Sequence, residues 1–232
     1  MADFLSPAEW TAVLLSLRIA VVATLASLPF GIFFAYALAR WRFPGKTLLA
    51  AIIYLPLVLP PVVTGYMLLI AFGRRGIFGA PLADLGIVLS FHWTGAALAC
   101  AVMGFPLMVR AMRLSFEATD PRLEQAAGTL GANPIVSFFL VSLPLALPGI
   151  IAGATLAFAR ALGEFGATIT FVANIPGETQ TIAAAIYTFI QVPGGDAAAL
   201  RLTFVSIVIA LAAIIASETF QRQGEKRLAR SA

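Results

Sequence analysis

Residues 117–149, EATDPRLEQAAGTLGANPIVSFFLVSLPLALPG, decide the fold of this chain. Asp120 followed by Pro121 predicts a helix start, because the residue before a proline is extended and proline suits the first helical position. Gly131 can supply the left-handed residue that ends this helix. The stretch therefore predicts a short helix, a tight turn and a new helix at an angle, placed between two membrane-length apolar segments.

The second helix of the stretch begins with Asn133-Pro134, which repeats the cap-and-proline pattern. The first helix is amphipathic, and its apolar face holds Leu123, Ala126, Ala127 and Leu130. Its other faces hold Arg122, Glu124, Gln125 and Thr129. A helix this short is not stable alone in water, so the apolar face needs a partner. An ordinary amphipathic loop lying at the membrane surface is the alternative interpretation.

The composition is that of an all-α polytopic membrane protein. Of the 232 residues 60% are hydrophobic and only 11% are charged, against about a quarter charged in soluble domains. The net charge of +4 indicates no nucleic-acid role, because the basic residues lie at span ends. Cys100 is the single cysteine, which excludes a disulfide framework or a thiolate metal site within one chain. No cleavable signal peptide is expected, since the first apolar segment lacks a basic leader.

Five apolar segments are predicted to cross the membrane, at about 11–38, 47–72, 90–112, 136–162 and 199–220. The second contains Pro56, Pro60 and Pro61, which predict either a hinge or pore-lining break or a packing kink. The apolar piece 182–190 is too short to cross and is expected to form a surface or re-entrant helix. The whole chain, 1–232, is expected to be one domain, with a core at about 11–220, a loop at 117–135 and a tail at 221–232.

The distribution of basic residues predicts the orientation in the membrane. Ten of them fall on one side: Arg40, Arg42, Lys46, Arg110, Arg113, Arg122, Arg222, Lys226, Arg227 and Arg230. Only Arg74 and Arg75 fall in the opposite loops. Because positive residues stay cytoplasmic, we expect the N-terminus outside, and the tail and the 117–135 loop in the cytoplasm.

The loop resembles the EAA motif of ABC importer permeases, which reads Glu-Ala-Ala, three residues, Gly, nine residues, Ile, any residue, Leu-Pro. Here Gln125-Ala126-Ala127, Gly131 and Val141-Ser142-Leu143-Pro144 keep the spacing. Two positions depart: Gln125 replaces Glu, with Glu124 one place earlier, and Val141 replaces Ile. The resemblance implies the fold of a type I importer permease, with a coupling helix that docks on a separate ATPase subunit. The docking residues it implies are Leu123, Glu124, Gln125, Ala126, Ala127, Leu130 and Gly131.

A finer resemblance covers nearly the whole chain. ARALGEFGAT (159–168) is similar to the sulfate and molybdate branch of ABC permeases. ITFVANIPGETQTI (169–182), LPLVLPPVVTGYMLL (55–69) and FGRRGIFG (72–79) resemble the molybdate permeases of that branch. The resemblance implies a bacterial inner-membrane homodimer, two ATP-binding subunits on the cytoplasmic side, and a periplasmic protein that delivers the oxyanion. Molybdate is the expected substrate, with tungstate or sulfate as alternatives.

Arg160 and Glu164 are charged residues at the outer end of the fourth predicted span. A charge at membrane depth is costly and is usually paired or faces a cavity. The two side chains are one helical turn apart and form either an ordinary i, i+4 pair or a structural clasp beside an outer gate. In the clasp, Gly163 and Gly166 would allow close helix packing.

A weakly binding pathway is expected to follow the axis of the dimer, lined mainly by the second, third and fourth spans. A doubly charged oxyanion needs a path that does not trap it. The candidate lining residues are Thr64, Gly65, Thr155 and Thr168. Arg18 and Arg201 are the main bases without an evident counter-charge.

Other function classes lack their characteristic residues. There is one histidine, no His-Glu-x-x-His run and no carboxylate pair within the spans, so a membrane-embedded enzyme is poorly supported. No ATP site is found, and no cofactor, metal or catalytic residue is expected. A stand-alone channel or secondary transporter remains an alternative, although buried acidic residues for ion coupling are nearly absent.

Overall fold

The computed structural model describes the backbone of residues 4–231; it does not describe the side chains of residues 217 and 220–231. Every regular element in that range is helical, as predicted. In chain order they are α1 Pro7–Arg40, α2 Lys46–Val58, α3 Pro61–Phe72, α4 Gly79–Asp84, α5 Trp93–Ala118, α6 Pro121–Thr129, α7 Pro134–Ser137, the π-helical turn η1 Phe138–Ser142, α8 Leu143–Leu145, α9 Leu147–Leu162, α10 Gly166–Val172, α11 Ile182–Phe189 and α12 Asp196–Ser231.

Among the described residues, α1, α5 and the Asp196–Ala216 part of α12 are long and apolar enough to cross a membrane. Two bent helix pairs, Lys46–Val58 with Pro61–Phe72 and Pro134–Leu145 with Leu147–Leu162, raise the number to five if each counts as one span. The five segments are those predicted from the sequence. α11 has eight residues, well short of the about 20 that a crossing needs.

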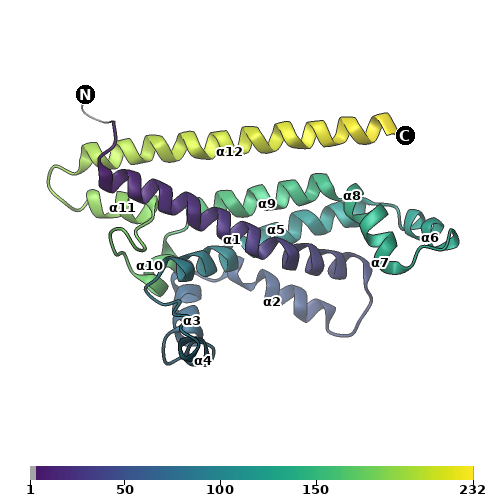
Figure 1. The fold of residues 1–232 in the computed structure, drawn as a ribbon, viewed down its shortest axis with the longest axis horizontal. Coiled ribbons are helices and arrows are strands. Elements are labelled where there is room, and N and C mark those ends of the chain that lie inside the picture. The colour runs from purple at the N-terminus through teal and green to yellow at the C-terminus, as the bar shows by residue number, and fades with distance from the viewer. Residues whose placement is uncertain (1–3, 232) are drawn as a thin grey trace.

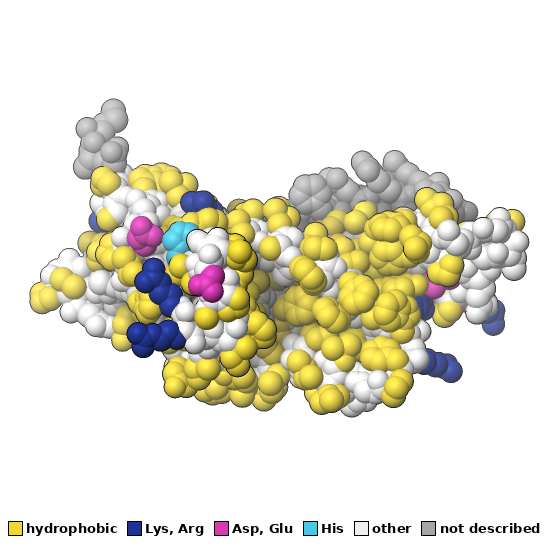
Figure 2. All heavy atoms as spheres, turned by 60° about the horizontal axis from the view of Figure 1, so that its bottom comes forward, with side chains coloured by type: hydrophobic (Ala, Val, Ile, Leu, Met, Phe, Trp, Pro, Cys, Tyr) yellow, Lys and Arg dark blue, Asp and Glu magenta, His cyan; other side chains and the backbone are white. Residues whose placement is uncertain are grey.

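The core lies where α1, α5 and α9 pack side by side (Figure 1). Small residues let their backbones approach closely. A Cβ at Gly104 of α5 would lie 3.2 Å from Ala157 of α9, and one at Gly153 would lie 2.8 Å from the Met108 carbonyl oxygen. On the face of the molecule in Figure 2, apolar side chains dominate the middle and charged ones gather toward the two ends.

The predicted second span is two helices rather than one. The chain bends by 115° between α2 and α3. The reason is that Leu59 and Pro60 each precede a proline and are held in extended backbone, with ψ of 144° and 135°. The sequence predicts either a hinge or pore-lining break or a packing kink here. An angle this large is a break, and it turns α3 and α4 out to one side of the molecule (Figure 1).

The fourth predicted span is also bent, by 69°, between α8 and α9. The two short helices α10 and α11 follow α9. α10 packs against α3 and α5, and α11 packs against α1 and α12.

The connecting segments lie toward the two ends of the long axis of the molecule (Figure 1). One end carries α6, α7, the connection from α1 to α2 and the C-terminal end of α12. The other end carries the start of α1, α4 and α11. Arg40, Arg42 and Lys46 therefore lie at the same end as α6. The side chains of the basic tail, 221–232, lie outside the described part.

Candidate functional site

α6 begins at the cap predicted from the sequence. The Asp120 side chain accepts a hydrogen bond from the Arg122 amide at 2.9 Å, and Pro121 is the first helical residue. α7 begins in the same way, with Asn133 accepting from the Val136 amide at 2.8 Å. Local hydrogen bonding thus fixes where both helices start.

The turn between α6 and α7 depends on one glycine. Gly131 has φ of +89°, a left-handed conformation that side chains with a Cβ resist. The amide of Ala132 then donates to the Ala127 carbonyl at 3.0 Å, and the Gly131 amide to the Gly128 carbonyl at 3.0 Å. This pair of bonds is a Schellman motif, so the predicted helix end at Gly131 is confirmed.

An exposed apolar surface covers α6 and the start of α7. The exposed fractions are 47% for Leu123, 89% for Leu130 and 69% for Ile135. No residue of α6 is buried. Gln125 and Ala126 are exposed, while Ala127 is half-buried. We call Leu123, Ala126, Leu130 and Ile135, on α6, its end and the start of α7, the docking surface, because exposed apolar groups gathered together are typical of contact sites.

Glu124 differs from its neighbours because its carboxylate turns inward. Oε1 lies 3.1 Å from Nε of Arg40 and accepts a hydrogen bond from the Ser142 hydroxyl at 2.6 Å. Oε2 accepts a hydrogen bond from the Tyr36 hydroxyl at 3.4 Å. Sequence reasoning grouped Glu124 with the docking residues and missed Arg40, Tyr36 and Ser142 as its partners.

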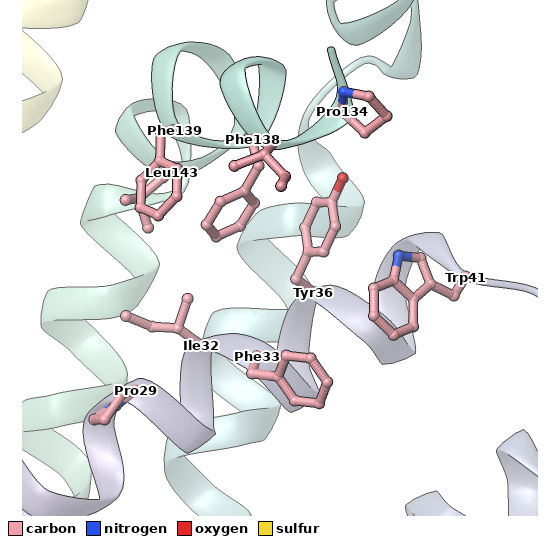
Figure 3. A pocket seen from close by; sticks show the side chains of 10 residues that line it. Pro29, Ile32, Phe33, Tyr36, Trp41, Pro134, Phe138, Phe139 and Leu143 are labelled. Atoms are coloured by element: carbon pink, nitrogen blue, oxygen red, sulfur yellow. The ribbon is translucent and has the colours of Figure 1, made fainter.

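A pocket of about 470 Å³ lies between α1 and the segment formed by α7 and η1 (Figure 3). Its lining is apolar and aromatic, including Ile32 and Phe33 of α1 and Phe139 of η1. Tyr36 and Phe138, also in the lining, contact each other edge to face with ring centroids 4.8 Å apart. These aromatic contacts brace α1 against η1.

At the opposite end, Arg160 and Glu164 form the predicted ion pair, with Nη1 2.7 Å from Oε2. Glu164 lies beyond the end of α9 and its side chain is only 1% exposed. Its Oε1 also accepts the Ala167 amide at 2.8 Å, at the start of α10. The carboxylate therefore joins α9 to α10, which an ordinary exposed i, i+4 pair would not do.

The two glycines beside this pair have different surroundings. A Cβ at Gly166 would lie 2.7 Å from Pro61 Cβ, so Gly166 allows α10 to pack on α3. At Gly163 the nearest neighbour of such a Cβ is the Ala159 carbonyl oxygen at 4.0 Å. Close packing at Gly163 was a wrong prediction for this chain, because that side of the turn is open.

The four predicted pathway residues do not lie on one surface. Thr64 and Thr168 are buried, and a Cβ at Gly65 would lie 2.5 Å from the Ala167 carbonyl oxygen. Thr155 is half-buried and lines a separate groove of about 350 Å³ between α1, α9 and α12. Within one described chain, α3 and α10 therefore pack together at Gly65, and Thr155 lines a different part of the molecule.

Arg18 and Arg201, the two bases without an evident counter-charge in the sequence, both contact a distant residue. Arg201 Nη2 lies 2.8 Å from Glu9 Oε1. The Arg18 guanidinium lies 3.7 Å from the centroid of the Trp93 ring, a cation–π contact. The expectation of a missing counter-charge was therefore wrong for Arg201, whereas the partner of Arg18 is an uncharged ring.

Comparisons with known proteins agree with this architecture. The family model described as "Binding-protein-dependent transport system inner membrane component" matches residues 27–229. The molybdenum transport system permease protein ModB of Escherichia coli (strain K12) is 59% identical, over 97% of this chain and 99% of that protein. ModB of Haemophilus influenzae is 53% identical, over 95% and 96%. The sulfate transport system permease protein CysT of Salmonella typhimurium is 40% identical, over 76% and 64%.

Solved structures share the fold at low sequence identity. A chain of the bacterial alginate ABC transporter, in complex with an alginate pentasaccharide-bound periplasmic protein, superposes with a TM-score of 0.73 at 17% identity, over 94% of this chain and 80% of that one. A chain of the methionine ABC transporter MetNI superposes with a TM-score of 0.70 at 16% identity, over 97% and 99%. With its family match over residues 27–229, the chain belongs to the inner membrane components of binding-protein-dependent transport systems.

Proposed function

We propose that this chain is the membrane-spanning permease subunit of an ATP-driven importer that carries molybdate. The observation that carries the proposal is its 59% identity, over 97% of its length, to a molybdenum transport system permease. The exposed apolar docking surface on α6 and α7 supports it further, because an importer permease without its own ATP site needs a contact for its ATPase.

The proposed assembly holds two copies of this chain, two ATP-binding subunits and a periplasmic molybdate-binding protein. Each copy, residues 1–232, works as one domain and docks an ATPase through residues 117–144. The docking surface supplies the apolar contacts, and Gln125, Ala127 and Gly131 complete the docking set. The side of the molecule that carries Arg40, Arg42 and Lys46 faces the cytoplasm, and the N-terminus faces outward.

The translocation path in this proposal runs between the two copies. The burial of Thr64, Gly65 and Thr168 supports a path that opens only when α3 and α10 move apart. Glu164, held by Arg160 and by the start of α10, is placed to act as the clasp of an outer gate, with Gly166 allowing the close contact to α3. Substrate selectivity then resides mostly in the delivery protein.

The direct test is uptake into proteoliposomes that contain this chain with its ATPase, the delivery protein and ATP. We expect accumulation of labelled molybdate that stops when ATP or the delivery protein is omitted. An excess of unlabelled tungstate is expected to compete and sulfate to compete less well. ATP-independent molybdate flux through the chain alone would favour a channel or secondary transporter instead. The second candidate function is a sulfate permease, because the chain is 40% identical to CysT. Uptake of sulfate in preference to molybdate would favour it.

A further inference from the structure

The carboxylate of Glu124 joins three segments at the end of the molecule that carries α6. It pairs with Arg40 at the end of α1, and it accepts the hydroxyls of Tyr36 of α1 and Ser142 of η1. Arg40 extends the network, because its Nη2 donates to the Thr119 carbonyl at 2.8 Å just after α5 ends. One side chain of α6 is thus tied to α1 and η1, and through Arg40 to the end of α5.

The network is shielded from solvent. The Arg40 and Glu124 side chains are 12% and 21% exposed, and Ser142 is fully buried. Hydrogen bonds to an ionised group are roughly twice as strong as neutral ones, and low local polarity strengthens them further. The Tyr36 ring is itself held by Phe138 and by Phe116 of α5, with centroids 4.8 and 5.4 Å apart.

The rest of α6 provides little attachment. None of its residues is buried, and the apolar side chains of Leu123 and of Leu130, which follows the helix, are exposed. Ser142 is the last residue of a π-helical turn, an irregularity that is frequent at functional sites. It stands four residues before Ala146, at the bend between α8 and α9. Apart from the chain connections at its two ends, a displacement of α6 therefore reaches α1 and this bend through Glu124.

We propose that Glu124 is a positioning residue that transmits movement of α6 to α1 and η1, rather than a contact for the ATPase. This inference rests on the proposed function and deepens it, because it assigns the transmission of ATP-driven movement to a carboxylate turned away from the docking surface. Gln125, the exposed neighbour at the motif's usual Glu position, stays on the outer side of the helix.

The test uses the complete complex reconstituted with the substitutions Glu124→Ala, Glu124→Gln and Ser142→Ala. With Glu124→Ala we expect ATPase binding within about twofold of normal. The amount of molybdate carried per ATP hydrolysed should fall at least about tenfold, because that is the factor expected for one lost charge-assisted hydrogen bond. Glu124→Gln keeps hydrogen-bonding capacity and is expected to lose less. Ser142→Ala is expected to act in the same direction, and adding it to Glu124→Ala is expected to change little more.

Glu178 offers a control for the loss of a carboxylate, because it is exposed and lies between α10 and α11, outside the segment proposed to dock the ATPase. Glu178→Gln is expected to leave transport per ATP unchanged. Hydrogen exchange gives a readout that needs no transport: amides of residues 122–130 are expected to exchange at least about tenfold faster in Glu124→Ala than in Glu178→Gln.

Three results would overturn the inference. In the first, Glu124→Ala releases the ATPase, which would make Glu124 a direct docking contact. In the second, transport per ATP and exchange in α6 are both unchanged. In the third, Ser142→Ala and Glu124→Gln lower transport only as far as they lower the unfolding temperature of the complex. That result would give Glu124 a purely structural role. Failure of the proposed function looks different, since the unsubstituted chain would then retain no ATPase or carry no molybdate.

Discussion

Oε1 of Glu9, in the first turn of α1, accepts two hydrogen bonds from Arg201 of α12, from Nε at 3.1 Å and from Nη2 at 2.8 Å. The Glu9 side chain is fully buried, and its other oxygen accepts the Ser6 amide at 2.5 Å. Only 11% of the apolar stretch of α12 is buried, so this pair is a major attachment of the last helix to the first.

Replacing Arg201 by Met should therefore loosen α12. It leaves the Glu9 carboxylate buried without its cation, which costs about 3 kcal/mol, the lower end for a broken buried pair. Thermal unfolding of the purified protein in detergent measures the loss. The double variant Glu9→Gln with Arg201→Met should recover much of it, since no uncompensated charge remains. A single variant as stable as the unsubstituted protein would show that the pair does not hold α12.

The turn after α6 predicts a difference between substitutions of Gly131. Gly131→Val forces a β-branched residue to φ near +89°, at a cost of about 1–2 kcal/mol. The substitution should weaken ATPase binding and transport while leaving membrane insertion intact. A Cβ here meets nothing within 4 Å, so the effect comes from the backbone alone. Gly131→Asn, which tolerates this conformation, should act mildly. Equal defects in the two variants, measured by ATPase co-purification, would contradict this origin.

Gly163 and Gly166 predict opposite outcomes for the same change to Ala. At Gly166 the added methyl lies 2.7 Å from Pro61 Cβ, so α10 and α3 must separate, at a cost of about 1–3 kcal/mol. At Gly163 the methyl enters open space, and the change should stay within about 0.5 kcal/mol. The unfolding temperatures of the two variants in the same detergent provide the comparison. A greater loss for Gly163→Ala would contradict the packing described for these helices.

The proposed orientation predicts where reporter fusions become active. Fusions at the C-terminus and within residues 114–134 should report a cytoplasmic location, and fusions within 73–89 and 165–197 should report the outside. The basic side chains at the α1–α2 connection are the physical reason. A cytoplasmic result within 165–197 would mean that α10 or α11 belongs to an additional crossing.

The features that the sequence predicted correctly are local ones. Asp120, Asn133 and Gly131 act on amides and carbonyls within five residues, so their effect can be inferred without knowing the fold. The prolines of the second span likewise predicted either a break or a packing kink within it. Its angle of 115° could not be predicted, because it depends on how α3 packs against α10.

The features that the sequence missed depend on distant partners. Glu9 and Arg201 are 192 positions apart, and Arg40 and Glu124 are 84 apart. No local pattern distinguishes Gly166, which contacts Pro61, from Gly163, which contacts little. Glu124 was assigned to docking because its sequence position resembles that of the EAA motif, whereas the direction of its side chain is set by Arg40 and Ser142.

We propose that an ATPase subunit binds the α6–α7 end of this chain, and site-directed cross-linking tests this contact without relying on transport. Cys100 is buried, so a cysteine placed at Leu130 provides the reactive thiol on the surface. Ile77, near α4 at the other end, is a matched control because it is 80% exposed, against 89% for Leu130. In the assembled complex, Leu130→Cys should cross-link to the ATPase subunit and Ile77→Cys should not. Cross-linking from Ile77→Cys with none from Leu130→Cys would mean that the ATPase binds the opposite end of the chain.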